Sequence, residues 1–355
     1  YFCIYCIMNM VITKTLTHWY SVNKRDLPWR QTKKPYFIWL SEIILQQTQV
    51  NQGLPYYEAF IIKYSSVNAL AEASESEVLK LWQGLGYYSR ARNLHSTAKH
   101  IVKELQGEFP KDYKGLMQLK GIGDYTASAI ASICFNEVCA VVDGNVFRFL
   151  SRYYGIRTPI NSSRGQKEFK GLAQQLISRN NPSEFNQAIM EFGAIQCKPK
   201  NPNCSVCPFQ NECIAYQENT IVELPVKLKG AKISKKHFNF LVFISDDHKT
   251  IIEKRKGSGI WQNLYQFPLI ESPSEMDNQG VMTHLKTLPL INESSCTLSL
   301  YNENEIIHKL SHQHLYTKFW IVELETLPTA SIEIDSIRDY PVPILISNFI
   351  EAFNF

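Results

Sequence analysis

The chain has 355 residues, of which 45% are hydrophobic and 20% are charged, and its formal net charge is +4. This length allows two domains with a core each, in an ordinary soluble composition. The small positive charge permits nucleic-acid binding without requiring it. No apolar run is long enough to span a membrane, so we expect no membrane association.

Residues 1–10 are expected to be a non-native N-terminal extension. The segment begins with Tyr1, contains Met8 and Met10, and lacks the basic region of a signal peptide. A translation-start extension explains these features better than a secretory leader, and we attribute the Cys3-x-x-Cys6 spacing to chance. The fold prediction therefore starts at residue 11.

Residues 14–215 read as one helix after another, and we assign 11–217 to one mainly α-helical domain. If a helix starts at Pro35, Glu42 shares a face with Trp39 and Leu45. Desolvation among apolar neighbours raises a carboxyl pKa, which suits the group to donate a proton near neutrality. A surface glutamate, or a buried one whose hydrogen bonds are satisfied, is the alternative.

Residues 119–145, LKGIGDYTASAIASICFNEVCAVVDGN, combine a turn with a carboxylate. Gly121 and Gly123 predict a tight hairpin that glycines make at little cost, and the following helix offers free N–H groups to a phosphate. An ordinary αα-hairpin is the alternative. Asp143 precedes a further helical run, where an N-cap is the structural alternative to catalysis. We expect Asp124, beside the phosphate site, to cap the second helix.

Four cysteines form a C-x6-C-x2-C-x5-C run: Cys197, Cys204, Cys207 and Cys213. Cysteines this dense, in a chain without a secretory signal, favour a metal or cluster over disulfides. Zinc and a [4Fe-4S] cluster both accept four thiolates, and the spacing alone leaves both open.

The sequence character changes after residue 217. Residues 218–236 are rich in lysine, including Lys232, and contain Pro225, as expected of an exposed basic linker. From Phe238 to Ile244 apolar residues alternate with others, and a turn candidate at 246–248 predicts a β-hairpin with the residues from Thr250 on. We therefore expect an α+β domain over 237–355.

Together the hairpin LKGIGDYTA, the segment AVVDGN and the cysteine spacing resemble the endonuclease III superfamily of DNA glycosylases. Within it, the chain is most similar to the MutY-type adenine DNA glycosylases, through LPWR at 27–30, WLSEIILQQTQV at 39–50 and GLGYYSRARNL at 84–94. The motifs span most of 27–213. The C-terminal half matches more weakly, in IWQNLYQFP at 260–268 and LSH at 310–312.

The resemblance implies a helix-hairpin-helix glycosylase domain with one [4Fe-4S] cluster in the loop 197–213, then a Nudix-like domain at 237–355 that reads 8-oxoguanine. Glu42 would protonate adenine, Asp143 would stabilise the sugar cation, and Asn145 would orient Asp143. Tyr125 stands where the bifunctional relatives carry a lysine. A tyrosine cannot form an imine, so we expect hydrolysis without strand cleavage.

Further segments of the family imply contacts with DNA. The residues expected to touch the adenine, the duplex or the opposite base are Arg30, Gln47, Thr48, Leu85, Tyr87, Tyr88, Gly121, Gly123, Ser311 and His312. Leu310 departs from the family pattern, which often has an aromatic residue there. No Nudix box occurs in 237–355, so we expect no pyrophosphatase activity.

The implied function is removal of adenine opposite 8-oxoguanine or guanine in duplex DNA, by a monomer that leaves an abasic site. If the chain is bacterial, its location would be cytoplasmic and nucleoid-associated. Two other functions remain open: a lyase of the endonuclease III type acting on oxidised pyrimidines, and a non-enzymatic DNA-binding protein. A zinc module in place of the cluster is a third alternative.

Overall fold

The computed structural model describes residues 4–230, 233–288, 296–327, 330–353 and 355, with side chains from residue 11 onward. The chain divides into two units, which we call the helical unit (Tyr1–Glu72 and Asn93–Lys229) and the sheet unit (Ala73–Arg92 and Gly230–Phe355). Cys3, Lys232 and the side chain of Cys6 lie outside the described part. Within that part, no helix is both long and apolar enough to cross a membrane.

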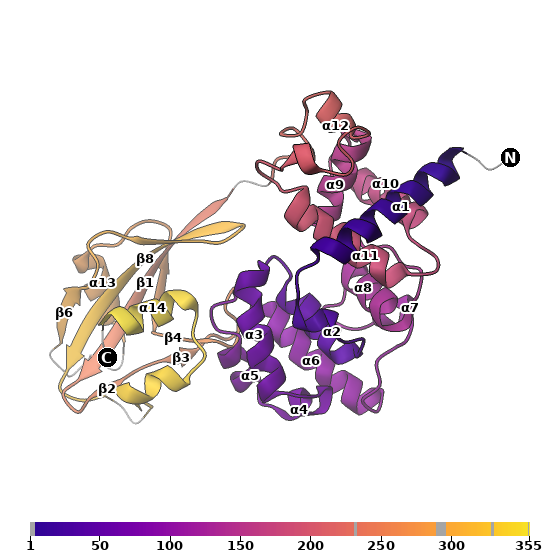
Figure 1. The fold of residues 1–355 in the computed structure, drawn as a ribbon. Coiled ribbons are helices and arrows are strands. Elements are labelled where there is room, and N and C mark those ends of the chain that lie inside the picture. The colour runs from indigo at the N-terminus through magenta and orange to yellow at the C-terminus, as the bar shows by residue number, and fades with distance from the viewer. Residues whose placement is uncertain (1–3, 231–232, 289–295, 328–329, 354) are drawn as a thin grey trace. The chain divides into compact units, whose positions relative to one another are not determined.

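The helical unit confirms the predicted mainly α-helical fold (Figure 1). Its elements are α1 (Ile4–Asn23), η1 (Pro28–Arg30), α2 (Pro35–Ile44), α3 (Val50–Lys63), α4 (Val67–Glu72), α6 (Ser89–Glu104, which begins in the sheet unit), α7 (Tyr113–Leu116), α8 (Asp124–Phe135), α9 (Gly144–Tyr154), α10 (Ser163–Leu176), α11 (Pro182–Glu191), η2 (Phe192–Gln196), η3 (Cys204–Val206) and α12 (Ile214–Gln217).

Helix α2 begins at Pro35, as predicted, because proline fits the first helical position, where its missing N–H costs nothing. Helix α8 follows the hairpin and is lined by small residues. Ala127, Ala129 and Ala131 are fully buried, so neighbouring backbones can approach closely. Helices α2 and α11 both pack against α8, which brings the predicted Glu42 helix and the hairpin helix together.

The sheet unit contains a five-stranded sheet with strand order β5-β1-β8-β6, and β7 also pairs with β8. All pairs are antiparallel except β1 with β8. The elements of the unit are α5 (Glu75–Leu81), β1 (Ser234–Ser245), β2 (Lys249–Thr250), β3 (Glu253–Lys254), β4 (Tyr265–Gln266), β5 (Leu269–Ser272), α13 (Asn278–Leu285), β6 (Thr297–Leu300), β7 (Ile306–Lys309), β8 (Gln313–Leu324), β9 (Ile332–Glu333), η4 (Ile334–Asp339) and α14 (Ile344–Phe353). The α+β prediction is confirmed.

A strand is present at β1, as predicted, but its residues do not alternate between buried and exposed. The hairpin predicted after it is also wrong. All residues from Phe238 to Phe243 are buried, because both faces of the strand are covered. Phe243 packs in a core with α13, while Phe319 of the adjacent β8 stacks on Phe349 of α14 with ring centroids 4.0 Å apart. A central strand of this kind loses the two-residue period. After the turn, β2 pairs with β9 and not with β1.

Candidate active site

Glu42 is buried in the second half of α2. Burial raises its pKa to about 7, and the negative charge of Asp143 acts in the same direction. A hydrogen bond from the Tyr125 hydroxyl opposes the shift by stabilising the carboxylate. Glu42 is therefore a carboxyl group that is half protonated near neutral pH, the state required of a general acid.

Tyr125 lies in the first turn of α8, one residue after Asp124. Burial raises its pKa well above 10, and the charges of Glu42 and Asp143 raise it further. Its hydroxyl also contacts the Met190 sulfur at 3.2 Å. Tyr125 therefore remains a neutral hydrogen-bond donor beside both carboxyl groups.

Asp143 is the N-cap of α9, so the capping role that was the alternative to catalysis is present. Its Oδ1 accepts hydrogen bonds from the backbone N–H groups of Asn145 (2.9 Å) and Val146 (2.8 Å), and its Oδ2 accepts one from the Asn145 side chain (2.7 Å). Burial raises the pKa of Asp143, while these donors counteract the shift. The cap fixes the carboxylate without removing it from the neighbourhood of Glu42.

Arg148, one turn along α9, was not singled out in the sequence. Its guanidinium donates to Asn145 Oδ1 (2.8 Å), to the carbonyl of Cys197 (2.7 Å) and to the carbonyl of Gly193. Arg148 therefore connects the Asp143–Asn145 cap to the start of the cysteine loop. Asn145 and the Gly144 carbonyl (3.3 Å) are its local partners, whereas Cys197 and Gly193 are more than 40 positions away in sequence.

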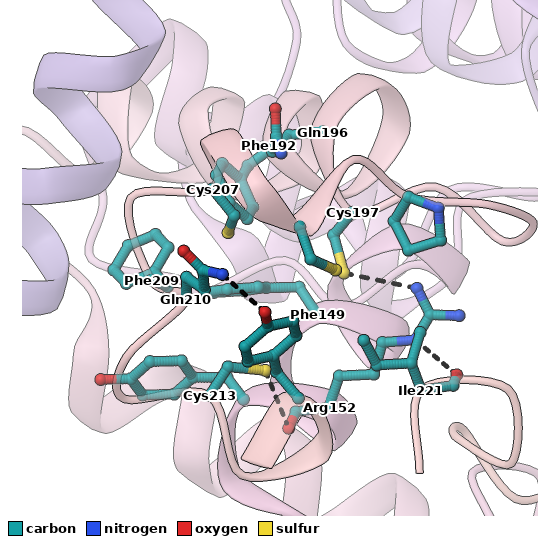
Figure 2. Close-up of a pocket in the computed structure, with 14 residues that line it drawn as sticks. Phe149, Arg152, Phe192, Gln196, Cys197, Cys207, Phe209, Gln210, Cys213 and Ile221 are labelled. Atoms are coloured by element: carbon teal, nitrogen blue, oxygen red, sulfur yellow. Dashed lines mark hydrogen bonds between the residues drawn. The ribbon is translucent and has the colours of Figure 1, made fainter. Parts of the chain in front are cut away.

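The four cysteines of the loop line one pocket (Figure 2). Aromatic residues form much of its wall: Phe149, Tyr153, Phe192 and Phe209. Arg152 of α9 lies 3.5 Å from Cys197 Sγ and donates to the Lys198 carbonyl at 2.7 Å. In the described residues, no three His, Cys, Asp or Glu side chains form a group that could hold one metal ion.

The chemistry of these thiols fits a cationic group among them. Burial raises the pKa of Cys207 to about 12, and the charges of Cys197, Cys213 and Cys204 add to the increase. Four neighbouring thiolates repel one another, so their joint ionisation requires positive charge at their centre. Arg152 supplies part of it from one side.

The hairpin before α8 uses its two glycines differently. Gly121 has φ +78°, a left-handed conformation that favours glycine. Gly123 has φ −96°, which any residue adopts, so only Gly121 needs the conformational freedom of glycine. A Cβ on Gly123 would meet no atom within 4 Å. The space over its backbone is therefore open to a ligand.

Asp124 does not cap α8, contrary to the prediction. It is the first residue of the helix, and Gly123 is the N-cap. Its carboxylate accepts hydrogen bonds from the Tyr113 hydroxyl (2.8 Å) and from Lys170 Nζ (2.9 Å). The negative charge beside the hairpin is thus paired with a lysine of α10.

Arg30, expected to contact the adenine, is bound to a buried carboxylate. Arg30 and Arg25 both form ion pairs with Glu191, at 2.6 and 2.7 Å. Burial raises the pKa of Glu191, but the hydrogen bonds from the two arginines outweigh it and lower the pKa to about 2. Glu191 follows Met190, which contacts Tyr125, and no local pattern in the sequence indicated that it binds two arginines.

In the helical unit, Gln47 and Thr48 follow α2. Gln47 is exposed with φ +54°, and the Thr48 hydroxyl donates to the Gln46 carbonyl at 3.3 Å. In the turn after α2, the Gln47 side chain is thus exposed, whereas the Thr48 side chain is hydrogen-bonded to the backbone of the same turn.

The sheet unit brings the other predicted DNA contacts around one pocket of about 580 Å³. Its lining includes Leu85, Tyr87, Tyr88, Trp261, His308, Ser311 and His312. Leu85 and Tyr88 are buried, whereas Tyr87 is 47% exposed. Ser311 and His312 are exposed at the tight turn between β7 and β8, which the Leu310 N–H closes by donating to the Gln313 carbonyl at 2.9 Å.

Two family models match the chain. Residues 40–175 match the HhH-GPD superfamily base excision DNA repair protein, and residues 239–352 match the NUDIX domain. The chain is 35% identical over 309 residues to the adenine DNA glycosylase of Buchnera aphidicola subsp. Schizaphis graminum, covering 86% of each protein. It is 45% identical over 212 residues to that of Homo sapiens, covering 57% of this chain and 39% of the human protein.

Solved structures match the helical part. A thermostable thymine-DNA glycosylase has a TM-score of 0.55 and 30% identity, covering 59% of this chain and 97% of that protein. Endonuclease III in a non-covalent complex with DNA has a TM-score of 0.52 and 21% identity, with the same shares covered. The second likeness shows the fold alone.

Proposed function

The chain belongs to the adenine DNA glycosylase family of base excision repair, and from this premise we propose that it removes adenine opposite 8-oxoguanine or guanine by hydrolysis alone. The observation that carries the proposal is the joint placement of Glu42, Tyr125 and Asp143. It combines an acid half protonated near neutrality with a second carboxylate and a neutral hydroxyl. The DNA would be a duplex, since the adenine must be flipped out of a stack before these groups can reach it.

The first step requires a proton on the leaving base. Adenine leaves poorly as an anion, and Glu42, with a pKa of about 7, can donate a proton to the ring as the N-glycosidic bond breaks. The Tyr125 hydroxyl, bonded to Glu42, stabilises the carboxylate that results. Glu42 can then accept a proton from the attacking water.

The second step requires negative charge beside the sugar. Loss of the base leaves an oxocarbenium-like sugar, which a fixed carboxylate stabilises or attacks. Asp143 is held for that role by Asn145 and Val146. Because its partners are already in place, little reorganisation is needed when the charge develops.

Strand cleavage by these enzymes requires an amine that forms a Schiff base with the sugar. Tyr125 occupies the position of that lysine in the lyase relatives. The tyrosine side chain has no amine that could form a Schiff base, and its hydroxyl donates a hydrogen bond to Glu42. This supports a monofunctional enzyme that leaves an abasic site.

Recognition of the opposite base is assigned to the pocket of the sheet unit. Tyr87, Ser311 and His312 offer an exposed ring and four polar side-chain atoms around a volume of about 580 Å³, large enough for a purine. Ser311 and His312 are both exposed, and a contact of 3.4 Å joins their side chains, so each can turn toward a ligand by giving up that one weak contact. This pocket is our candidate for the 8-oxoguanine site.

The cysteine pocket is our candidate for the cofactor site. Cys197, Cys204, Cys207 and Cys213 would hold one [4Fe-4S] cluster, whose chemistry is to cross-link the loop through four thiolate bonds. Arg152 would donate to the Cys197 sulfur, and Arg148 would hold the backbone of the same residue. Visible absorption of anaerobically purified protein tests the assignment, because a zinc site has no such band.

A single-turnover assay tests the function. With a duplex containing adenine opposite 8-oxoguanine, we expect free adenine, an abasic site and an intact strand before alkali. Release of thymine glycol without release of adenine would contradict the proposal. Borohydride trapping is the second arm, since a stable covalent adduct would show a lyase. We also propose a monomer, which analytical ultracentrifugation checks.

A further inference from the structure

The segment 138–143, which ends at Asp143, belongs to no helix or strand in the described residues. Side chains bond its backbone instead. Gln174 of α10 accepts from the Ala140 N–H at 2.9 Å and donates to the Val138 carbonyl at 2.7 Å. Asn186 of α11 accepts from the Val141 N–H at 3.1 Å and donates to the Cys139 carbonyl at 2.8 Å.

Lys170 makes a further bond to this segment and joins it to the hairpin helix. Its Nζ donates to the Ala140 carbonyl (2.8 Å), to Ser128 Oγ of α8 (2.9 Å) and to Asp124 Oδ2 (2.9 Å). One ammonium group therefore uses its three donors on three places: the segment that carries Asp143, the helix that carries Tyr125, and the first residue after the hairpin.

We propose that Lys170 is a positioning residue that holds the segment 138–143, and with it Asp143, while it neutralises Asp124 beside the DNA-binding hairpin. This inference rests on the catalytic role proposed for Asp143. Buried backbone groups without a partner are costly, so the segment keeps its path only while side chains satisfy it. A shift of about 1 Å at a catalytic group can lower a rate by up to about 100-fold.

The two tasks of Lys170 are separable. Its bond to the Ala140 carbonyl affects the position of Asp143, and therefore the rate of the chemical step. Its bond to Asp124 affects charge beside the hairpin, where an unpaired carboxylate would repel a DNA phosphate. Gln174 shares the first task only, since it is neutral and its side-chain amide bonds to Ala140 and Val138 of the segment.

The experiment compares Lys170→Met, Gln174→Met, Asp124→Asn and the double variant Lys170→Met/Asp124→Asn. Lys167→Met is the matched control, because it removes the same charge from an exposed position of the same helix. Two quantities are measured: the single-turnover rate of adenine release at saturating duplex, and the Kd for a duplex with an uncleavable adenine analogue over a range of salt concentrations.

We expect Lys170→Met to lower the rate about 10-fold and to weaken binding several-fold more than Lys167→Met does. Gln174→Met should lower the rate and leave Kd unchanged. Asp124→Asn should keep the rate and tighten binding. In the double variant, Kd should return to the wild-type value while the rate remains low. Gln174 is exposed, so its variant tests the positioning step even if Lys170→Met does not fold.

A rate for Lys170→Met and Gln174→Met within about two-fold of the Lys167→Met rate would overturn the positioning role. A double variant that regains both Kd and rate would also overturn it, because charge at Asp124 would then explain everything. Asp143→Asn separates a failure of the proposed chemistry from a failure of the positioning role. If that variant keeps its activity, the proposed chemistry fails, whereas an inactive Asp143→Asn beside an unaffected Lys170→Met rejects only the positioning.

Discussion

The carboxyl pair of the helical unit and the β7–β8 turn of the sheet unit are built in opposite ways. Asp143 has three hydrogen bonds already formed, and Glu42 is buried against Tyr125. Ser311 and His312 are exposed, and their side chains contact each other only at 3.4 Å. Groups that stabilise a developing charge gain from being fixed beforehand. Groups that read a base need unused hydrogen-bonding capacity.

The largest effect should come from removing Glu42, the proposed acid of the carboxyl pair Glu42–Asp143, which we call the fixed pair. Glu42→Gln keeps the size of the side chain but cannot donate a carboxyl proton, so single-turnover adenine release should fall by about 1,000-fold or more. The Kd for the mispaired duplex should change by less than about three-fold. Glu58→Gln, at an exposed glutamate of α3, is the control. Unchanged base release would remove Glu42 from the mechanism.

Asp143→Asn separates chemistry from capping. Asparagine caps helices as well as aspartate does, so the melting temperature should hardly change, while adenine release should fall about 100-fold because the charge near the sugar is lost. Asp277→Asn makes the same change at the N-cap of α13 in the sheet unit. A loss of activity in Asp277→Asn as large as in Asp143→Asn would show a general effect of changing a capping aspartate and not a role for the charge of Asp143.

The pH profile is a third test of the fixed pair. With a Glu42 pKa of about 7, the protonated enzyme disappears above that pH, and the rate should fall about ten-fold per pH unit. A flat profile from pH 7 to 9 would contradict this.

Stability should follow the same carboxyl group. Between pH 4.5 and about 7, Glu42 keeps its proton in the folded chain and loses it in the unfolded chain. The stability that this proton gives at low pH is therefore lost as the pH rises. The free energy of unfolding should fall by up to about 3 kcal/mol from this group. Glu42→Gln should remove that part of the decline in denaturant titrations at pH 5 and pH 8. If the free energy of unfolding of Glu42→Gln declines with pH as much as that of the wild type, other groups cause the decline.

The smallest effect is expected at the open turn. Ser311→Ala should lower the preference for 8-oxoguanine over guanine about five-fold, the value of one ordinary hydrogen bond, and should leave excision opposite guanine unchanged. The ratio of the two single-turnover rates measures it. Thr297→Ala, at an exposed position of β6, is the control. Equal losses on both substrates would show a general defect and not a role in reading the base.

Local signals in the sequence predicted the local structure of the site. Pro35 marked the start of α2, the residues after Gly123 marked α8, and the Asp143 cap is present as an ordinary N-cap. Each depends on neighbours within about four residues, which is the range over which capping and helical periodicity act.

Partners distant in sequence could not be predicted. Glu191 binds Arg25 and Arg30 across more than 160 positions, and Lys170 reaches Asp124 from another helix. For a charged residue on a helix, solvent exposure is the default expectation, and only the tertiary fold reveals the exceptions. The same limit explains β1, whose alternation disappears because helices cover both faces.

The parallel pairing of β1 with β8 also sets an order of events during synthesis. Ser234 pairs with Gln313 and Ser245 with Leu324, so the ribosome completes β1 long before its central partner exists. Contacts this far apart in sequence form slowly. In that interval the run from Phe238 to Phe243, which is apolar except for Asn239, lacks the strand that later pairs with one of its edges. An unpaired edge of this kind favours aggregation when a protein is overproduced.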